Sequence, residues 1–132
     1  MSRLPAYLVL TGALVAFHAA VAESKPAAGG RSAAVPAGDA EAGRELYVES
    51  CRACHSGAIA PSLKGIVNRP IAAAPGYTFS AGLKAKAGKT WTAAELNAFM
   101  ADPKTYAPGT KMMKAVPDAQ ERADIIAYLQ EL

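Results

Sequence analysis

The residues best suited to chemistry in this sequence are Cys51, Cys54 and His55, which form a Cys-x-x-Cys-His run. The chain has no other cysteine. Two thiols one helical turn apart can add across the two vinyl groups of a haem, and the histidine that follows can reach the iron from the same face. The run therefore predicts a haem held covalently by Cys51 and Cys54, with His55 as an axial ligand.

Three other kinds of site use pairs of cysteines, and each explains these residues less well. A redox Cys-x-x-Cys pair usually sits in a βαβ context, and no strand-like alternating run precedes this one. A structural zinc site takes four ligands, whereas the chain beyond residue 22 offers two thiols and one imidazole. A disulfide across so short a loop would be strained and would leave His55 without a role. Haem attachment is favoured, and a thiol redox site stays as the alternative.

The first 22 residues have the pattern of a secretory signal peptide. Arg3 supplies a positive start, residues 8–17 are largely apolar, and Ala20-Val21-Ala22 forms an A-x-A-like cleavage site. We expect cleavage and export to a bacterial periplasm, with no stable membrane insertion afterwards. The alternative is an uncleaved anchor, because the apolar run approaches the lower length limit of a spanning helix.

The rest of the chain divides into a leader and one domain. Residues 23–37 are mostly Ala, Gly, Pro and Ser, so they cannot bury enough surface to order themselves, and we interpret them as flexible. Residues 38–132 form a domain whose core is thin for lack of length, and a buried porphyrin would supplement it. The net charge of the full chain is only +3, which argues against nucleic-acid binding.

Local signals predict an all-α fold with three main helices, short helical pieces and long loops. Asp39 can cap a first helix whose buried face extends into the two cysteines. Thr92 begins a capping box with Glu95 before a second helix, which should end at residues 102–103. Asp118 starts a terminal helix in the same way. A tract rich in Pro and Gly separates the first two helices, with room for one short helical piece at residues 80–86.

Gly43 lies inside the first predicted helix, where a glycine costs about 1 kcal/mol relative to alanine. A simple weak point in the helix is one interpretation. We favour a notch at which the first helix crosses the last, with Tyr47 and Tyr128 packed beside it.

Methionine is the natural second axial ligand, because His55 is the only histidine left once the signal peptide is removed. The candidates are Met100, Met112 and Met113. Met100 shares a helix stripe with Leu96, which favours core packing. Met112 and Met113 lie instead in a predicted loop, residues 106–113, where Pro and Gly fix the backbone and no helical period requires two thioethers.

Six motifs follow one another along residues 38–132: the Cys-x-x-Cys-His run, APSLKGIVNR, APGYTFS, WTAAEL, DPKTYAPGTKM and ERADIIAYL. This series resembles the class I c-type cytochromes, especially the branch of mitochondrial cytochrome c and bacterial cytochrome c2. The resemblance implies the cytochrome c fold around one covalently bound haem c per chain. It also implies that Met112 is the axial methionine and that the carbonyl of Pro61 accepts the other ring N–H of His55.

Further positions match the same family. Arg69 and Trp91 correspond to residues near the haem propionates, where their N–H groups can offset negative charge. Leu63 would pack on the histidine side of the haem, and Thr110 would help to order the methionine loop.

The sequence departs from the family at three positions around the expected haem. Phe79 and Phe99 stand where the family often has tyrosines, so the hydrogen bonds of those hydroxyls should be absent. Lys114 stands where an aromatic side chain usually covers the haem edge. We expect haem binding to be intact and the reduction potential and partner choice to be affected.

Histidine and methionine together fill both axial positions and leave no open site on the iron. We therefore expect no enzyme but a monomeric, soluble carrier of single electrons between respiratory partners, such as a dehydrogenase or bc1-type complex and an oxidase or reductase. Two alternatives stay open: a peroxidase-like or ligand-sensing protein with a displaceable methionine, and a fixed electron-entry subunit of an enzyme complex.

Charge is distributed unevenly along the domain. Residues 51–116 contain nine Lys or Arg against Glu95 and Asp102, whereas the two terminal helices are mainly acidic. This pattern predicts a positive side around the haem loops, which would steer encounters with acidic docking surfaces in a salt-dependent way.

Overall fold

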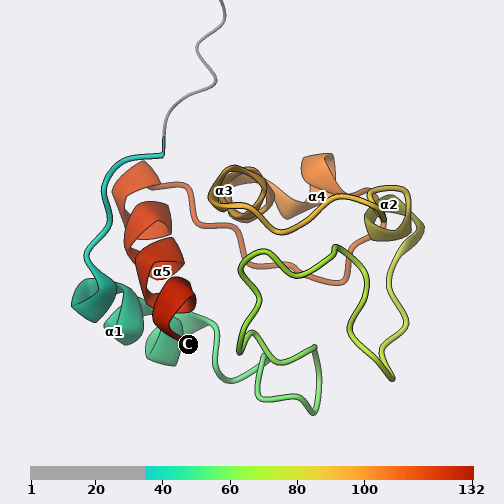
Figure 1. Cartoon of the computed structure of the whole chain (residues 1–132), viewed down its shortest axis with the longest axis horizontal. Helices are drawn as coiled ribbons and strands as arrows, with labels where there is room; N and C mark the ends of the chain where they lie inside the picture. Colours follow the sequence, from blue (N-terminus) through green and yellow to red (C-terminus); the bar gives the residue numbers. More distant parts are fainter. Residues whose placement is uncertain (1–34) are drawn as a thin grey trace, which may run out of the picture. The chain divides into compact units, whose positions relative to one another are not determined.

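The computed structural model describes residues 35–132, which fold into five helices joined by long loops, with no strand among them (Figure 1). Outside the helices, the described residues form two isolated β-bridges, between Pro70 and Thr90 and between Ala87 and Lys89. The predicted all-α class is therefore confirmed. The signal peptide and the greater part of the leader fall on residues 1–34, outside the described residues. The helices are α1 (Ala40–Ser50), α2 (Ala81–Lys84), α3 (Ala93–Ala101), α4 (Pro103–Tyr106) and α5 (Ala119–Glu131).

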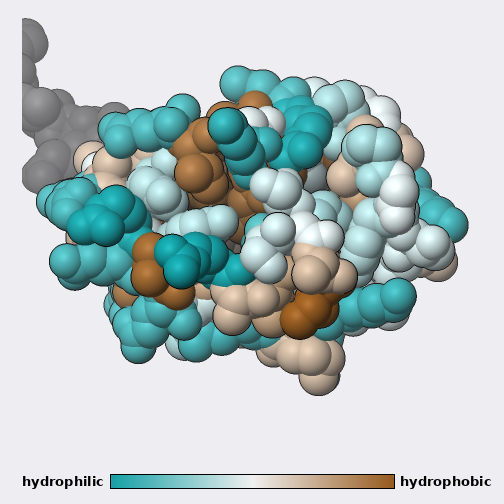
Figure 2. Space-filling model, turned by 90° about the horizontal axis from the view of Figure 1, so that it is seen from below, coloured by the Kyte–Doolittle hydropathy of each residue, from teal (hydrophilic) through white to brown (hydrophobic). Residues whose placement is uncertain are grey.

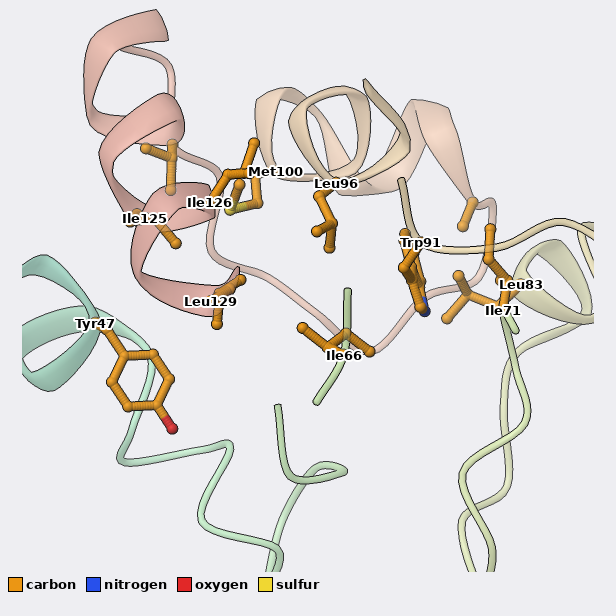
Figure 3. Packing of buried hydrophobic residues seen from close by; sticks show 12 residues of the cluster. Tyr47, Ile66, Ile71, Leu83, Trp91, Leu96, Met100, Ile125, Ile126 and Leu129 are labelled. Atoms are coloured by element: carbon orange, nitrogen blue, oxygen red, sulfur yellow. The ribbon is translucent and has the colours of Figure 1, made fainter. Parts of the chain in front are cut away.

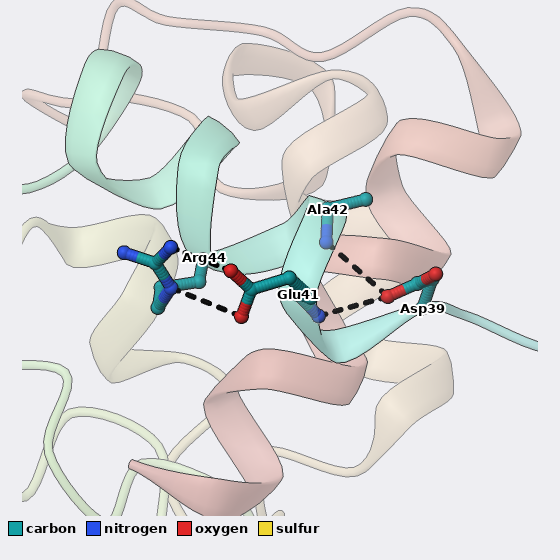
Figure 4. Close-up of polar contacts among 4 residues, drawn as sticks. All are labelled: Asp39, Glu41, Ala42 and Arg44. Carbon is teal, nitrogen blue, oxygen red and sulfur yellow. Dashed lines mark hydrogen bonds and ion pairs between the residues drawn. The ribbon is translucent and has the colours of Figure 1, made fainter.

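The helices begin at polar residues whose side chains cap them. The Asp39 carboxylate accepts hydrogen bonds from the backbone N–H groups of Glu41, at 2.9 Å, and Ala42, at 3.2 Å (Figure 4). Thr92 and Asp118 cap α3 and α5 through the same kind of bond. These caps satisfy backbone donors that have no partner inside the helix. The predicted starts of the three main helices are confirmed, as is the short helix predicted within residues 80–86.

Helices α1 and α5 pack closely because Gly43 provides a notch between them. A Cβ atom at Gly43 would lie 1.9 Å from the backbone oxygen of Asp124, so no larger residue fits there. Beside the notch, the rings of Tyr47 and Tyr128 lie 5.2 Å apart. The predicted notch is confirmed. None of the helices in residues 35–132 has the length and apolarity of a membrane span.

The second predicted helix ends at Ala101 as expected, but a further short helix, α4, follows at once. Its last residue, Tyr106, was predicted to begin the loop of Met112 and Met113, and that prediction was wrong. Pro103 needs no N–H partner and fits the first turn of a helix, while the Asp102 side chain accepts from the N–H of Thr105 at 3.1 Å. The pair that ends α3 therefore also begins α4.

Two further expectations need correction. The capping box predicted at Thr92 forms only in part. The N–H of Glu95 donates to the Thr92 hydroxyl, but the Glu95 carboxylate binds Lys89 and Tyr106 instead of the backbone at Thr92. Helix α1 ends at Ser50, and of the two cysteines that follow, Cys51 is half-buried whereas Cys54 is exposed. Only Cys51 therefore extends the buried face of α1.

The core lies between α3, α5 and the loops after α1. Leu96 and Met100 from α3, Leu129 from α5 and Ile66 and Trp91 from the loops point into it (Figure 3). Met100 is 6% exposed, which confirms its predicted role in core packing. At the start of the described chain, Val35 packs against this core and the carbonyl of Ala37 accepts a hydrogen bond of 2.9 Å from Gln120.

Candidate haem-binding site

The cysteine run continues from α1 as a series of turns. The N–H of Cys51 donates to the carbonyl of Tyr47 at 2.9 Å, and the N–H of His55 donates to the carbonyl of Cys51 at 3.0 Å. Burial raises the pKa of the Cys51 thiol, and the nearby positive charge of Lys114 partly opposes that rise. The backbone thus places two thiols and an imidazole within one short turn segment.

His55 is oriented by a hydrogen bond to the chain that follows it. Its Nδ1 lies 2.8 Å from the carbonyl oxygen of Pro61. Because this carbonyl can only accept, Nδ1 is the donor, and in the neutral ring the free lone pair lies on Nε2, as in a metal-binding histidine. Two residues further on, Leu63 is half-buried against the core.

Arg69 and Trp91 are brought together by backbone pairing. The N–H of Trp91 donates to the carbonyl of Arg69 at 2.9 Å, and the carbonyl of Trp91 accepts from Asn68 at 3.0 Å. Trp91 is only 6% exposed. The guanidinium of Arg69 donates through one terminal nitrogen to the carbonyls of Ser62 and Lys64, at 3.1 and 3.2 Å.

The Nε of Arg69 is buried and has no hydrogen-bond partner among the described residues. Leaving a buried charged donor without an acceptor is costly, so such an atom calls for an anionic oxygen from outside the chain. A propionate of a bound haem would supply such an oxygen. The residues present therefore fit a haem. They provide a pair of cysteines, an oriented imidazole and, at Arg69 Nε, a buried donor without an acceptor among the described residues.

The methionine loop follows α4 and is ordered by its own hydrogen bonds. The N–H of Thr110 donates to the carbonyl of Ala107 at 3.0 Å, and the Thr110 hydroxyl accepts from the N–H of Met112 at 3.3 Å. Met112 is half-buried, whereas Met113 is 72% exposed. Of the two loop methionines, Met112 is therefore the one that lies toward the interior.

The three departures from the family take clear places in the structure. Phe99 packs against both Trp91 and Tyr106, with ring centroids 5.2 and 5.4 Å away. Phe79 makes an edge contact with another ring of the same loop, at 4.9 Å. Lys114 is exposed. On the face shown in Figure 2, apolar surface lies between hydrophilic side chains in several places. Among the described residues, the large apolar side chains that are exposed are Val48, Ile59 and Met113.

A polar network beside Trp91 was missed by the sequence analysis. The ring of Tyr106 stacks on Trp91, with centroids 6.1 Å apart and planes 24° apart, and its hydroxyl donates to the Glu95 carboxylate. Lys89 pairs with the same carboxylate at 3.0 Å, and the ammonium of Lys86 lies 4.2 Å over the Tyr106 ring. No local signal predicts this contact, because Glu95 and Tyr106 belong to different helices.

The network shifts both of its acidic groups. The Tyr106 hydroxyl, and after it Lys89, holds the pKa of Glu95 below its usual value. Burial first, and the bond to Glu95 second, raises the pKa of Tyr106 well above its usual value. At neutral pH the pair is therefore a neutral phenol donating to a charged carboxylate.

The chain matches the family model of cytochrome c over residues 40–132. A cytochrome cH from Methylobacterium extorquens has a similar structure, with a TM-score of 0.65 and 43% sequence identity over 72% of this chain and 100% of that one. Cytochrome c2 of Rhodopila globiformis is 40% identical over 103 residues, which are 74% of this chain and 96% of that protein. The cytochrome c-type cyt cy of Rhodobacter capsulatus is 39% identical over 100 residues, 72% of this chain but only 50% of that protein.

These matches, together with a site whose residues fit a covalently bound haem, place the chain in the class of small haem proteins that carry electrons. The chain belongs to the cytochrome c family. Its cofactor is accordingly haem c, and the two cysteines of the sequence stand in the arrangement that attaches it. The chain is a single-haem electron carrier whose partners are redox proteins.

Proposed function

We propose that this carrier holds its iron between His55 and Met112 and works as a monomer in the bacterial periplasm. The observation that supports the ligand set best is the bond from His55 to the Pro61 carbonyl, at 2.8 Å. It fixes the ring and its tautomer, and it leaves Nε2 as the coordinating atom. Thr110 supports the other side of the site because it orders the backbone at Met112.

When bound, the haem supplies the one-electron chemistry of its iron. The residues of the chain would do the rest: Cys51 and Cys54 would attach the ring, Arg69 and Trp91 would hold a propionate, and Leu63 would keep water from the histidine side. Two protein ligands leave no vacant position for a substrate or for oxygen. We therefore propose electron transfer without enzymatic activity, and not a peroxidase or a ligand sensor.

The periplasmic address and the partners rest on the sequence. Residues 1–22 have the pattern of a cleaved signal peptide, and residues 38–132 form the haem domain. Residues 23–37 have the composition of a flexible leader, whose last residues contact the domain. The excess of Lys and Arg over residues 51–116 suits an acidic docking surface on a dehydrogenase, a bc1-type complex, an oxidase or a reductase.

The ligand set is tested by comparing Met112→Leu with the matched variant Met113→Leu. We expect the oxidised wild type to show the weak long-wavelength absorption band of a sulfur-bound haem. Met112→Leu should lose that band and bind carbon monoxide rapidly when reduced, whereas Met113→Leu should keep the band. Loss of the band in Met113→Leu alone would contradict the assignment. Rapid binding of carbon monoxide by the wild type would favour a ligand-sensing protein.

A further inference from the structure

Helix α2 touches the backbone of the methionine loop at a glycine. The N–H of Gly82 donates to the carbonyl of Pro108 at 3.2 Å. A Cβ atom at Gly82 would lie 2.4 Å from that same oxygen, 2.6 Å from the carbonyl carbon of Ala107 and 2.6 Å from the nitrogen of Pro108. All three are backbone atoms, so no side-chain rotation could make room.

Backbone conformation does not explain the glycine. Gly82 lies inside α2 and is absent from the positions with positive φ, so alanine could adopt its backbone angles. In an open helix, alanine at this position would be favoured by about 1 kcal/mol. The close approach of the methionine loop is therefore what requires glycine here.

Both sides of the contact are held in place. On the helix side, Leu83 is 8% exposed, and its N–H donates to the Ser80 hydroxyl at 3.3 Å. On the loop side, Ala107 is 0% exposed, and its N–H donates to the carbonyl of Pro103 at 2.9 Å. A side chain added between them must displace one side or the other.

We propose that Gly82 is a positioning residue that seats residues 107–112 against α2 and so controls how readily Met112 is displaced from the iron. The link runs through two hydrogen bonds, because the carbonyl of Ala107 accepts from Thr110 and the Thr110 hydroxyl accepts from Met112. A shift at Ala107 is carried to Met112 in this way. The inference rests on the proposed ligation by Met112.

The test is the variant Gly82→Ala in the oxidised holoprotein, titrated with imidazole while the long-wavelength band is followed. Overpacking a filled contact shifts an equilibrium by roughly one to two powers of ten. We expect the affinity for imidazole to rise by about tenfold or more. Affinity equal to that of the wild type would overturn the inference.

Two control variants separate positioning from general damage. Gly43→Ala adds the same methyl group at an equally tight contact, 1.9 Å from the Asp124 oxygen, but between α1 and α5. It should lower the stability of the fold and leave the affinity for imidazole unchanged. Ala81→Gly weakens α2 without adding atoms and should also leave that affinity unchanged. An equal rise in all three variants would mean that any destabilisation frees Met112, and the inference would be wrong.

A measurement on the wild type covers the case in which Gly82→Ala does not fold. Saturating imidazole should speed hydrogen exchange at the N–H of Gly82 and leave unchanged the exchange at Val116, whose N–H donates to the carbonyl of Met100 at 2.8 Å. Unchanged exchange at Gly82 would refute the proposal that Gly82 positions residues 107–112. A wild type that lacks the long-wavelength band would instead refute the ligation by Met112, so the two failures can be told apart.

Discussion

The hydroxyl of Tyr106 offers a clean test of the network beside Trp91, because Tyr106→Phe removes one atom and keeps the ring. The ring contacts with Trp91, Phe99 and Lys86 stay in place. A hydrogen bond to a charged acceptor contributes about 1.5–3 kcal/mol. The Glu95 side chain is 23% exposed, so water can replace part of the lost bond and the lower end applies. We expect Tyr106→Phe to lower the free energy of unfolding by about 1.5 kcal/mol at neutral pH.

The difference between Tyr106→Phe and the wild type should depend on pH at both ends. The pKa of folded Glu95 lies below 4.5, so its contribution is full above about pH 4.5 and is lost as the pH falls through the folded value. The pKa of folded Tyr106 lies above 10.0, so its contribution is full below about pH 10 and is lost as the pH rises. The stability difference should therefore be largest between these limits and shrink on either side.

Denaturation by guanidinium chloride, followed by circular dichroism across this pH range, measures the difference. Tyr77→Phe is the matched control, because its ring packs 4.9 Å from that of Phe79 and its hydroxyl has no hydrogen bond to any described residue. That control should change stability by less than about 0.5 kcal/mol. A difference between Tyr106→Phe and the wild type that does not vary with pH would refute the role given to the pair.

Two more predictions concern the helix crossing and the docking surface. Asp124 is 9% exposed and accepts hydrogen bonds from the N–H of Asp39 at 2.8 Å and from the Gln120 side chain at 2.9 Å. We expect Asp124→Ala to lower the free energy of unfolding by about 2–3 kcal/mol, measured by chemical denaturation, and Asp124→Asn to lower it clearly less. Equal costs would contradict the role of the Asp124 oxygen as a hydrogen-bond acceptor. Replacing Lys111 and Lys114 by Glu should slow reduction by an acidic partner at low salt and leave it unchanged at high salt; unaltered rates at low salt would contradict docking at this side.

Local sequence signals predicted the helix starts well, because a cap acts within three residues. Asp39, Thr92 and Asp118 each bond to a backbone N–H two or three positions ahead, a contact that needs no tertiary structure. The same local reasoning failed at Asp102-Pro103, where it predicted the end of one helix but not the start of α4. A proline that stops one helix also fits the first position of the next, and the sequence alone does not say which role it has.

Contacts between distant segments could be predicted only in part. The notch at Gly43 was foreseen because a glycine within a good helix needs a packing reason. Gly82 also lies within a helix, but α2 has only four residues and follows a tract rich in Pro and Gly. A glycine in such a segment does not by itself indicate a close contact. The unpartnered Nε of Arg69 likewise depends on the backbone pairing with Trp91, which joins residues 22 positions apart.

Phe79 and Phe99 have no hydroxyl groups, and this limits what can hold the methionine loop. Neither ring can donate a hydrogen bond, so within the described residues the side-chain bond to the backbone at Met112 comes from Thr110. A single bond of this kind contributes only about 1 kcal/mol. The position of the loop must therefore depend largely on packing at its start, where Ala107 is fully buried and Pro108 rests on Gly82. The contact of the loop with Gly82 therefore contributes the support that a hydroxyl at Phe79 or Phe99 cannot give.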